Sequence, residues 1–158
     1  MSDFKECQRK KTIKFGDDFA KRSEINLLFG LSEGAGTMQG GASLQPVGRV
    51  AIIWWPNDPC DNKDWVNVKE VLGPASDSRG YQEVLQISET NRNPLENERH
   101  IKETLETPRS QERYAFWHES RLGAHWYKFY GVYKLNHEKT KETGKCWFER
   151  IATETKIG

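Results

Sequence analysis

The residues of this chain that could act together in chemistry are concentrated between positions 113 and 134. Eight aromatic residues lie between Tyr114 and Tyr133, more than the packing of one strand pair requires. If this stretch forms two strands, their two-residue period brings rings and cations to one face. We expect that face to carry Trp117, Trp126 and Tyr130 beside Arg113, Lys128 and Lys134. Rings interleaved with cations hold an unpaired base and its phosphates, and stacking contributes about 1–3 kcal/mol per base.

A base removed from its stack needs an apolar surface on each face and polar groups for its hydrogen-bonding edge. We predict that Trp54 or Trp55 supplies one surface and that Trp117 or Tyr130 supplies the other. The residues predicted to bind the edge follow the tryptophan pair and are Asn57, Asp58 and Asp64. Taken singly, each tryptophan more often belongs to a hydrophobic core. The clustering of the rings is what favours a pocket.

Two histidines offer a catalytic alternative. His118 and His125 stand on either side of a predicted turn, where they could act as general acid and base in RNA cleavage. Zinc binding by both histidines with Cys146 is a further alternative, although their spacing matches no common zinc motif. Because unpaired histidines are common at protein surfaces, we favour exposed strand-end residues and lean towards a protein that is not an enzyme.

The glycine-rich segment 30–48 lacks the chemistry of a phosphate-binding loop. It contains no lysine and precedes an apolar strand, whereas GxxxxGK[ST] stands between a strand and a helix. We interpret the segment as a loop. Cys7, Cys60 and Cys146 are odd in number and widely separated, which predicts reduced thiols instead of a disulfide framework or a zinc site. We therefore predict no metal and no cofactor.

The elements that must position these residues are mostly strands. Apolar or alternating patterns predict strands over residues 50–55, 65–72, 81–87, 113–118, 125–135 and 146–152, with a helix as the alternative over 65–72. In the strand 125–135, the odd positions are expected to face the core. Helices are expected from Asp17 or Asp18 to Gly30 and over residues 95–105, with a charged hairpin turn over residues 139–144. This pattern favours an α+β fold, either a strongly curved, mostly antiparallel β-sheet or a small β-barrel with peripheral helices.

Length and composition describe one domain over residues 1–158. Its first 16 residues are basic and poor in apolar side chains, so we expect a peripheral or mobile segment. The longest apolar run, residues 50–55, is far shorter than the roughly 20 residues of a membrane-spanning helix, and the N-terminus has no signal-peptide core. We predict a cytoplasmic protein without membrane contact. A net charge of +1 requires that any nucleic-acid binding come from a local site.

The C-terminal strands resemble those of a known family. Residues 127–135, YKFYGVYKL, with residues 113–116 before them and 148–152 after them, are similar to the closing strands of PUA-like barrel modules. These modules include the SRA (SET and RING associated) type that accompanies bacterial modification-dependent restriction enzymes. The strand 50–55 with its following turn, and Trp65 with Asn67, resemble the earlier part of such modules.

The resemblance implies a DNA-binding module that receives a flipped or modified base in an aromatic pocket. The SRA pattern has an aspartate between the tyrosine and the glycine of its YDG string, whereas here Gly131 follows Tyr130 directly. The position of a base-reading carboxylate is therefore left open.

From the residues and the resemblance together, we predict a nucleic-acid-binding module that recognises a modified or flipped base. We expect its partner to be DNA in preference to RNA, with a nuclease subunit or domain alongside. Two alternatives stay open: a small nuclease-like enzyme using His118 and His125, and a protein-interaction subunit whose exposed rings are hot spots.

Overall fold

A computed structural model of the chain describes residues 2–35, 42–44, 46, 48–57, 64–72, 82–108 and 111–157. Four helices and ten strands lie in these ranges. In chain order they are α1 (Phe4–Lys10), β1 (Thr12–Lys14), β2 (Asp18–Phe19), α2 (Arg22–Leu28), β3 (Ala42–Leu44), β4 (Ile52–Trp54), β5 (Trp65–Leu72), β6 (Glu83–Asn91), α3 (Pro94–Glu106), β7 (Glu112–Arg121), β8 (Ala124–Leu135), α4 (His137–Thr143), β9 (Cys146–Ala152) and β10 (Glu154–Lys156).

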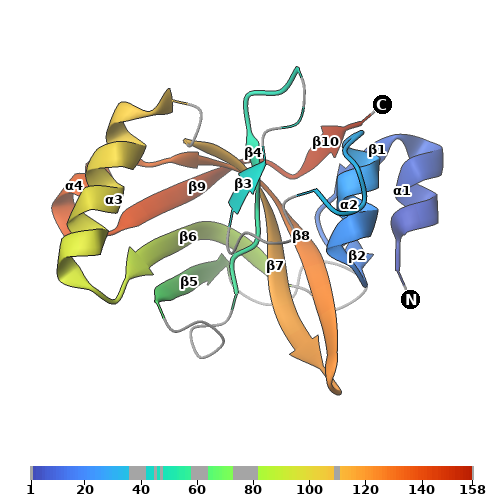
Figure 1. Cartoon of the computed structure of the whole chain (residues 1–158), viewed down its shortest axis with the longest axis horizontal. Coiled ribbons are helices and arrows are strands. Elements are labelled where there is room, and N and C mark those ends of the chain that lie inside the picture. The colour runs from blue at the N-terminus through green and yellow to red at the C-terminus, as the bar shows by residue number, and fades with distance from the viewer. Residues whose placement is uncertain are drawn as a thin grey trace.

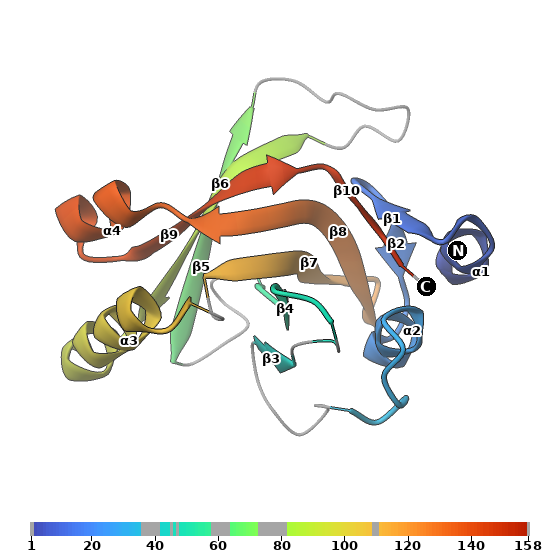
Figure 2. The same cartoon turned by 90° about the horizontal axis from the view of Figure 1, so that it is seen from above.

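Eight of these strands form one sheet with the order β3-β4-β7-β8-β9-β6-β5, and β2 pairs with β8 at its side. The pairs are antiparallel except for β4 and β7, which run parallel. The remaining strands, β1 and β10, form a two-stranded sheet. Helices α3 and α4 lie at one end of the molecule and α1 and α2 at the other, with the curved sheet between them (Figures 1 and 2). The predicted α+β class with a mostly antiparallel sheet and peripheral helices is confirmed.

Of the two predicted forms, the small barrel is not the one found, because the sheet stays open along β3 and β5 within the described part of the chain. A side chain, and not strand pairing, spans the opening. The Asn67 amide oxygen on β5 accepts a hydrogen bond of 3.1 Å from the backbone N–H of Asn57, just beyond β4. The same amide donates to the Ser88 carbonyl on β6 at 3.3 Å. The curvature therefore brings β5 close to the end of β4 without closing the ladder.

A β-bulge in the hairpin of β7 and β8 changes which side chains share a face. Ala115 pairs with Gly131 and Phe116 with Phe129, so Tyr130 is the extra residue. The expectation that the odd positions of residues 125–135 share one core face is therefore wrong. Tyr127, Phe129 and Val132 pack in a first core cluster, whereas Tyr130, Tyr133 and Leu135 pack in a second.

Glycine is required at the bulge. Gly131 has a φ of +137°, and a Cβ at this position would lie 2.5 Å from the carbonyl oxygen of Ala152 on β9. Only a residue without a Cβ allows this close approach of two strands.

Two local predictions need correction. The helix expected from Asp17 or Asp18 begins at Arg22, because Asp18 starts β2 and the Asp17 carboxylate accepts hydrogen bonds from the Lys14 N–H and the Cys7 thiol. The hairpin turn expected over residues 139–144 is α4. Its first turn is capped by the Asn136 side chain, and it ends at Gly144 in the left-handed region.

The basic N-terminal segment, expected to be peripheral or mobile, forms α1 and β1. Cys7 on α1 and Ile13 on β1 are buried in the first core cluster. The strand predicted over residues 65–72 and the helix predicted over 95–105 are confirmed as β5 and α3. The segment predicted as a glycine-rich loop contains the short strand β3.

Candidate nucleic-acid interface

The two adjacent tryptophans at the end of β4 belong to opposite faces of the sheet. Trp55 packs in the first core cluster, with its ring centroid 5.5 Å from that of Tyr127. Trp54 packs in the second, 5.1 Å from the ring of Phe148. Since Trp117 and Tyr130 also belong to the second cluster, only Trp54 shares their face.

Most of the side chains expected on an open surface of rings and cations lie in the interior instead. Trp117 is 1% exposed, Tyr130 4% and Lys128 7%. Trp126 is half-buried, and Lys134 is exposed. The reason is the curvature of the sheet, which turns both faces of the hairpin into core surface.

One lysine covers two of these buried rings. The Nζ atom of Lys69, on β5, lies 4.8 Å from the ring centroid of Trp117 and 5.4 Å from that of Tyr130. It also donates a hydrogen bond of 3.1 Å to the Tyr130 hydroxyl. The two rings are neighbours, with centroids 5.8 Å apart. A cation held over ring faces occupies a position in which a planar base would stack.

A carboxylate and a second lysine complete this cluster, which we call the ring–lysine site: Lys69, Trp117, Glu119, Lys128 and Tyr130. The Nζ atom of Lys128 lies 3.7 Å from Glu119 Oε1 and 5.9 Å from the Tyr130 ring centroid. Burial lowers the pKa of Lys128, although the charge of Glu119 opposes this effect. Burial also opposes ionisation of Glu119, but its hydrogen bond with Arg121 and the charge of Lys128 outweigh burial and lower its pKa. The site therefore holds polar and charged groups against two aromatic rings.

Arg113, expected beside the exposed rings, belongs to a buried network. It donates a hydrogen bond of 2.9 Å to Glu89 Oε1 on β6 and lies over the rings of Trp54 and Phe148. The other oxygen of Glu89 accepts a bond of 3.1 Å from the Trp54 indole N–H. Because Arg113 is only 3% exposed, its place is in the core and not on a binding surface.

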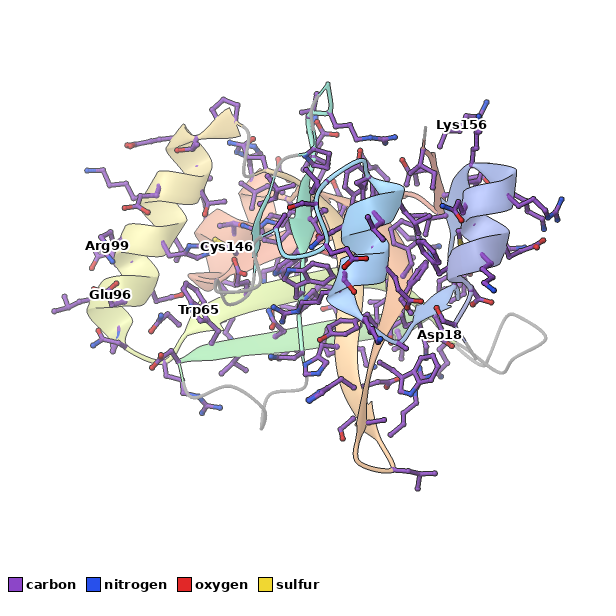
Figure 3. The ribbon with its side chains drawn as sticks, turned by 45° about the vertical axis from the view of Figure 1, so that its right-hand side comes forward. Asp18, Trp65, Glu96, Arg99, Cys146 and Lys156 are labelled. Atoms are coloured by element: carbon purple, nitrogen blue, oxygen red, sulfur yellow. The ribbon has the colours of Figure 1, made fainter. Side chains whose placement is uncertain are left out.

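His100 on α3 is the third partner of Glu89, at 2.6 Å. Burial disfavours the carboxylate, but the charge of Arg113 and the His100 contact outweigh it and lower the pKa of Glu89 to about 2. Burial also disfavours the imidazolium, but hydrogen bonds with Cys146 and Glu89 raise the pKa of His100 to about 9. Trp65, whose ring packs edge-on against His100, and Cys146 lie beside α3 in Figure 3.

The three residues predicted to read a base edge lie in different environments. Asn57 is half-buried next to β5, and its amide oxygen is buried without a hydrogen-bond partner among the described residues. Asp58 lies outside the described residues. Asp64 is exposed at the start of β5, where its carbonyl accepts from the Arg92 N–H. Of the two that the structure describes, Asn57 is the one whose side-chain acceptor is buried without a partner in the described ranges.

The two histidines of the catalytic alternative contact each other. His118 Nε2 lies 2.8 Å from His125 Nδ1, and the His118 ring stacks on Tyr127 with centroids 5.0 Å apart. Tyr127 belongs to the first core cluster, whereas Cys146 is buried in the second. The three zinc ligands considered from the sequence are therefore not assembled. Among the described residues, no group of three or more His, Cys, Asp or Glu side chains could hold a metal ion.

Sequence reasoning did not select Lys69 or Glu119. Lys69 and Tyr130 are 61 positions apart and meet only because the sheet curves. One feature of the sequence does point to Lys69. Asn67 and Lys69 occupy alternate positions of a strand otherwise rich in valine, which places their polar side chains on one face. Glu119 lies just beyond the predicted strand 113–118, whereas β7 continues to Arg121 and includes it.

No helix within the described ranges is long and apolar enough to cross a membrane. No curated protein matches the chain. Among solved structures, the chain is similar to the 5-hydroxymethylcytosine-specific restriction enzyme AbaSI, with a TM-score of 0.73 and 19% sequence identity. The match covers 98% of this chain and 45% of the restriction enzyme, so the chain spans less than half of that protein.

The family model of the SET and RING associated domain matches residues 6–157. This match confirms the resemblance that the C-terminal strands and the residues 50–55 indicated, and it covers almost the whole chain. The chain therefore belongs to the SRA (SET and RING associated) family and is a DNA-binding module that reads modified bases.

Proposed function

We propose that this chain reads a hydroxymethylated cytosine that is extruded from duplex DNA, and that the ring–lysine site receives it. The observation that carries the proposal is the position of Lys69, whose Nζ atom lies over the Trp117 and Tyr130 rings. A structurally similar protein is a restriction enzyme specific for 5-hydroxymethylcytosine, which supports this choice of base.

Binding requires that Lys69 move off the rings. A lysine over one aromatic ring contributes about 0.5–2 kcal/mol, and a base stacked on an aromatic side chain contributes about 1–3 kcal/mol. The exchange is therefore balanced or favourable for each ring, and two rings are available. Lys69 is half-buried on the edge strand β5, and its side chain has four rotatable bonds, so it can swing away without moving the backbone.

The charged groups of the site suit a hydroxymethyl substituent. A hydroxyl both donates and accepts hydrogen bonds. Lysine ammonium groups supply donors, and the Glu119 carboxylate supplies an acceptor. At 3.7 Å, the ion pair of Lys128 with Glu119 is longer than a hydrogen bond, and it brings a cation and a carboxylate together in the site. A methyl group or a hydrogen at the same position would leave these polar groups without a partner. The site would therefore bind 5-hydroxymethylcytosine more tightly than 5-methylcytosine or cytosine.

The amide of Asn57 is the proposed reader of the base edge. Cytosine presents an amino donor on that edge, and the buried oxygen of Asn57 lacks a donor. The family pattern has an aspartate between its tyrosine and its glycine, and this chain has none between Tyr130 and Gly131. The Asn57 oxygen is proposed to take the role of that aspartate.

Fluorescence anisotropy with short duplexes tests the proposal. The duplexes carry one central 5-hydroxymethylcytosine, 5-methylcytosine or cytosine and are otherwise identical. We expect the wild-type chain to prefer the hydroxymethylated duplex, and Lys69→Met to reduce that preference about tenfold, because a hydrogen bond to a charged group is lost. Lys139→Met is the matched control, since Lys139 also lies over a tryptophan, Trp147 at 3.9 Å, but on α4. Equal affinity of the wild type for all three duplexes would overturn the proposal.

DNA is the proposed partner in preference to RNA, and a nuclease domain or subunit is proposed to act alongside. The support is that the similar restriction enzyme is more than twice as long as the part that this chain matches. We expect the isolated chain to bind the hydroxymethylated duplex without cleaving it, and His118→Ala to change neither result. Cleavage by the isolated chain that His118→Ala abolishes would instead establish the nuclease-like alternative.

A further inference from the structure

The outer side of α3 carries a shallow groove, which we call the α3 groove. Its volume is about 520 Å³, and its lining comes from one helix alone: Leu95, Glu98, Arg99, Ile101, Lys102 and Leu105. Helix α3 lies at the end of the molecule away from α1 and α2 (Figures 1 and 2), and Figure 3 shows Glu96 and Arg99 on its outer side. The α3 groove shares no residue with the ring–lysine site.

The apolar part of the α3 groove continues outwards from the core. Ile101 and Leu105 are partly buried, because they pack against the second core cluster and also line the groove. Leu95, one turn and a half before Ile101 on the helix, is 77% exposed. A single exposed leucine is common at protein surfaces. Here, however, the leucine extends an apolar strip that begins in the core, and such a strip is suited to contact with another protein.

Four residues of the α3 groove form a regular seam along the helix. Leu95, Glu98, Lys102 and Leu105 follow one another at intervals of three, four and three residues. This is the spacing of the positions at which two helices of a coiled coil meet. Two leucines therefore stand at the ends of the seam, and two opposite charges stand between them.

The lining of the α3 groove is symmetric about position 100. Leu95 and Leu105 lie five residues on either side of this position, and Glu98 and Lys102 lie two residues on either side. If a second copy of the helix packs antiparallel about a two-fold axis at this point, each leucine meets the other leucine of the second copy. Each Glu98 likewise meets a Lys102. The surface is thus complementary to itself, as an interface with two-fold symmetry requires.

The charges favour the antiparallel arrangement over a parallel one. In a parallel pair, Glu98 would lie against Glu98 and Lys102 against Lys102, and like charges at such a contact are unfavourable. Among the described residues, neither Glu98 nor Lys102 forms an ion pair. On the same helix, Glu96 and Arg99 do pair with each other. Glu98 and Lys102 are therefore available to a second copy.

We infer that the α3 groove is the interface through which two copies of this chain form a symmetric, antiparallel dimer. The inference goes beyond the proposed function and requires no DNA. The helix has 13 residues and is about 20 Å long, so the contact is smaller than a standard protein interface. The dimer should therefore exchange readily with the monomer, with a dissociation constant in the micromolar range.

Sedimentation velocity of the DNA-free chain, from about 1 μM to about 1 mM, tests the inference across the affinity range of a small interface. We expect the average mass of the wild type to rise towards that of a dimer with concentration. Glu98→Lys and Lys102→Glu each bring like charges together twice in the dimer, so each should weaken association at least about tenfold. Glu103→Lys is the matched control, because Glu103 is exposed on α3 but does not line the groove.

Exchange of the two charges separates this interface from a general effect of charge or a loss of folding. The double variant Glu98→Lys/Lys102→Glu restores opposite charges across the two-fold axis and should dimerise about as well as the wild type. A mixture of the two single variants should also associate, since each supplies the charges that the other needs. Circular dichroism and thermal unfolding check that every variant is folded.

Three results would overturn the inference. A wild type that stays monomeric over the whole concentration range would show that a second copy does not occupy the α3 groove. Dimerisation that neither Glu98→Lys nor Lys102→Glu weakens would place the interface elsewhere. A double variant that stays monomeric although it is folded would exclude the pairing of Glu98 with Lys102. None of these measurements depends on whether the ring–lysine site binds hydroxymethylcytosine.

Discussion

Glu89 on β6 and Arg113 on β7 form a buried ion pair of 2.9 Å between two strands that are not neighbours in the sheet. The pair crosses the concave side of the sheet, and Trp54 and His100 bind the same carboxylate. The curvature that brings Lys69 over Trp117 is therefore held by charges in the core, and the candidate site depends on this network for its shape.

Removal of the charge of Glu89 should destabilise the protein strongly. In Glu89→Gln, Arg113 is left as a buried charge without its counter-ion, and we expect a loss of about 3–5 kcal/mol in the free energy of unfolding. Urea unfolding followed by tryptophan fluorescence measures this loss. Glu96→Gln is the control, because the pair of Glu96 with Arg99 is exposed and should contribute about 0–1 kcal/mol. Similar small effects in both variants would show that the network does not hold the fold.

The same network predicts how stability depends on pH. The pKa of His100 is raised from 6.5 to about 9, so its contribution is complete below pH 6.5 and is lost as the pH rises through 9. The pKa of Glu89 is lowered from 4.5 to about 2, so its contribution is complete above pH 4.5 and is lost as the pH falls towards 2. The contribution of His100 and Glu89 to stability should therefore be greatest between about pH 4.5 and pH 6.5.

Thermal unfolding from pH 2 to pH 10 measures this profile. In His100→Gln the fall in Tm between pH 6.5 and 9 should become smaller, whereas the acid limb should remain. An alkaline limb of the same depth in His100→Gln would show that another group is responsible for it.

Gly131 should be far less tolerant of a side chain than Gly144. Both have positive φ, but a Cβ at Gly131 would lie 2.5 Å from the Ala152 carbonyl, whereas a Cβ at Gly144 meets nothing within 4 Å. We expect Gly144→Ala to cost about 1 kcal/mol from backbone strain alone, and Gly131→Ala to cost at least about 2–3 kcal/mol more because β8 and β9 must separate. Chemical denaturation of the two variants gives the comparison, and equal costs would contradict the close approach of the strands.

Substitution of Asn57 should affect DNA binding, whereas substitution of Asn67 should affect stability. The Asn57 amide oxygen is buried without a partner, so Asn57→Ala should leave stability unchanged or raise it by up to about 1 kcal/mol. Its affinity for the hydroxymethylated duplex should fall about tenfold through loss of the base-edge contact. The Asn67 amide bonds to both Asn57 and Ser88, so Asn67→Ala should lower stability by about 1–3 kcal/mol. Calorimetry and anisotropy on both variants test the assignment, which fails if Asn57→Ala binds as well as the wild type.

Much of the fold follows from local patterns in the sequence. The alternation of residues 65–72 and the Asn-Pro start before residue 95 predict β5 and α3, since strand periodicity and helix caps are properties of neighbouring residues. The string around Tyr130 and Gly131 is similar enough to SRA modules to indicate the family. Asp17 accepts from the Lys14 N–H and the Cys7 thiol, and Asp18 accepts from Arg121, so neither begins the helix. An aspartate with such partners looks the same in sequence as one that caps a helix.

The candidate site depends on contacts that local sequence patterns do not predict. Sequence alone determined that rings and cations alternate from Arg113 to Lys134, and that the chain is an SRA-type module. Only the tertiary structure decided that the bulge at Tyr130 puts Tyr133 and Leu135 on the same face as this ring, that Arg113 is buried, and that Lys69 covers both rings. The physical reason is that burial and long-range contacts depend on the curvature of the sheet. That curvature is set by many pairings between residues far apart in the chain, and no short stretch of sequence contains them.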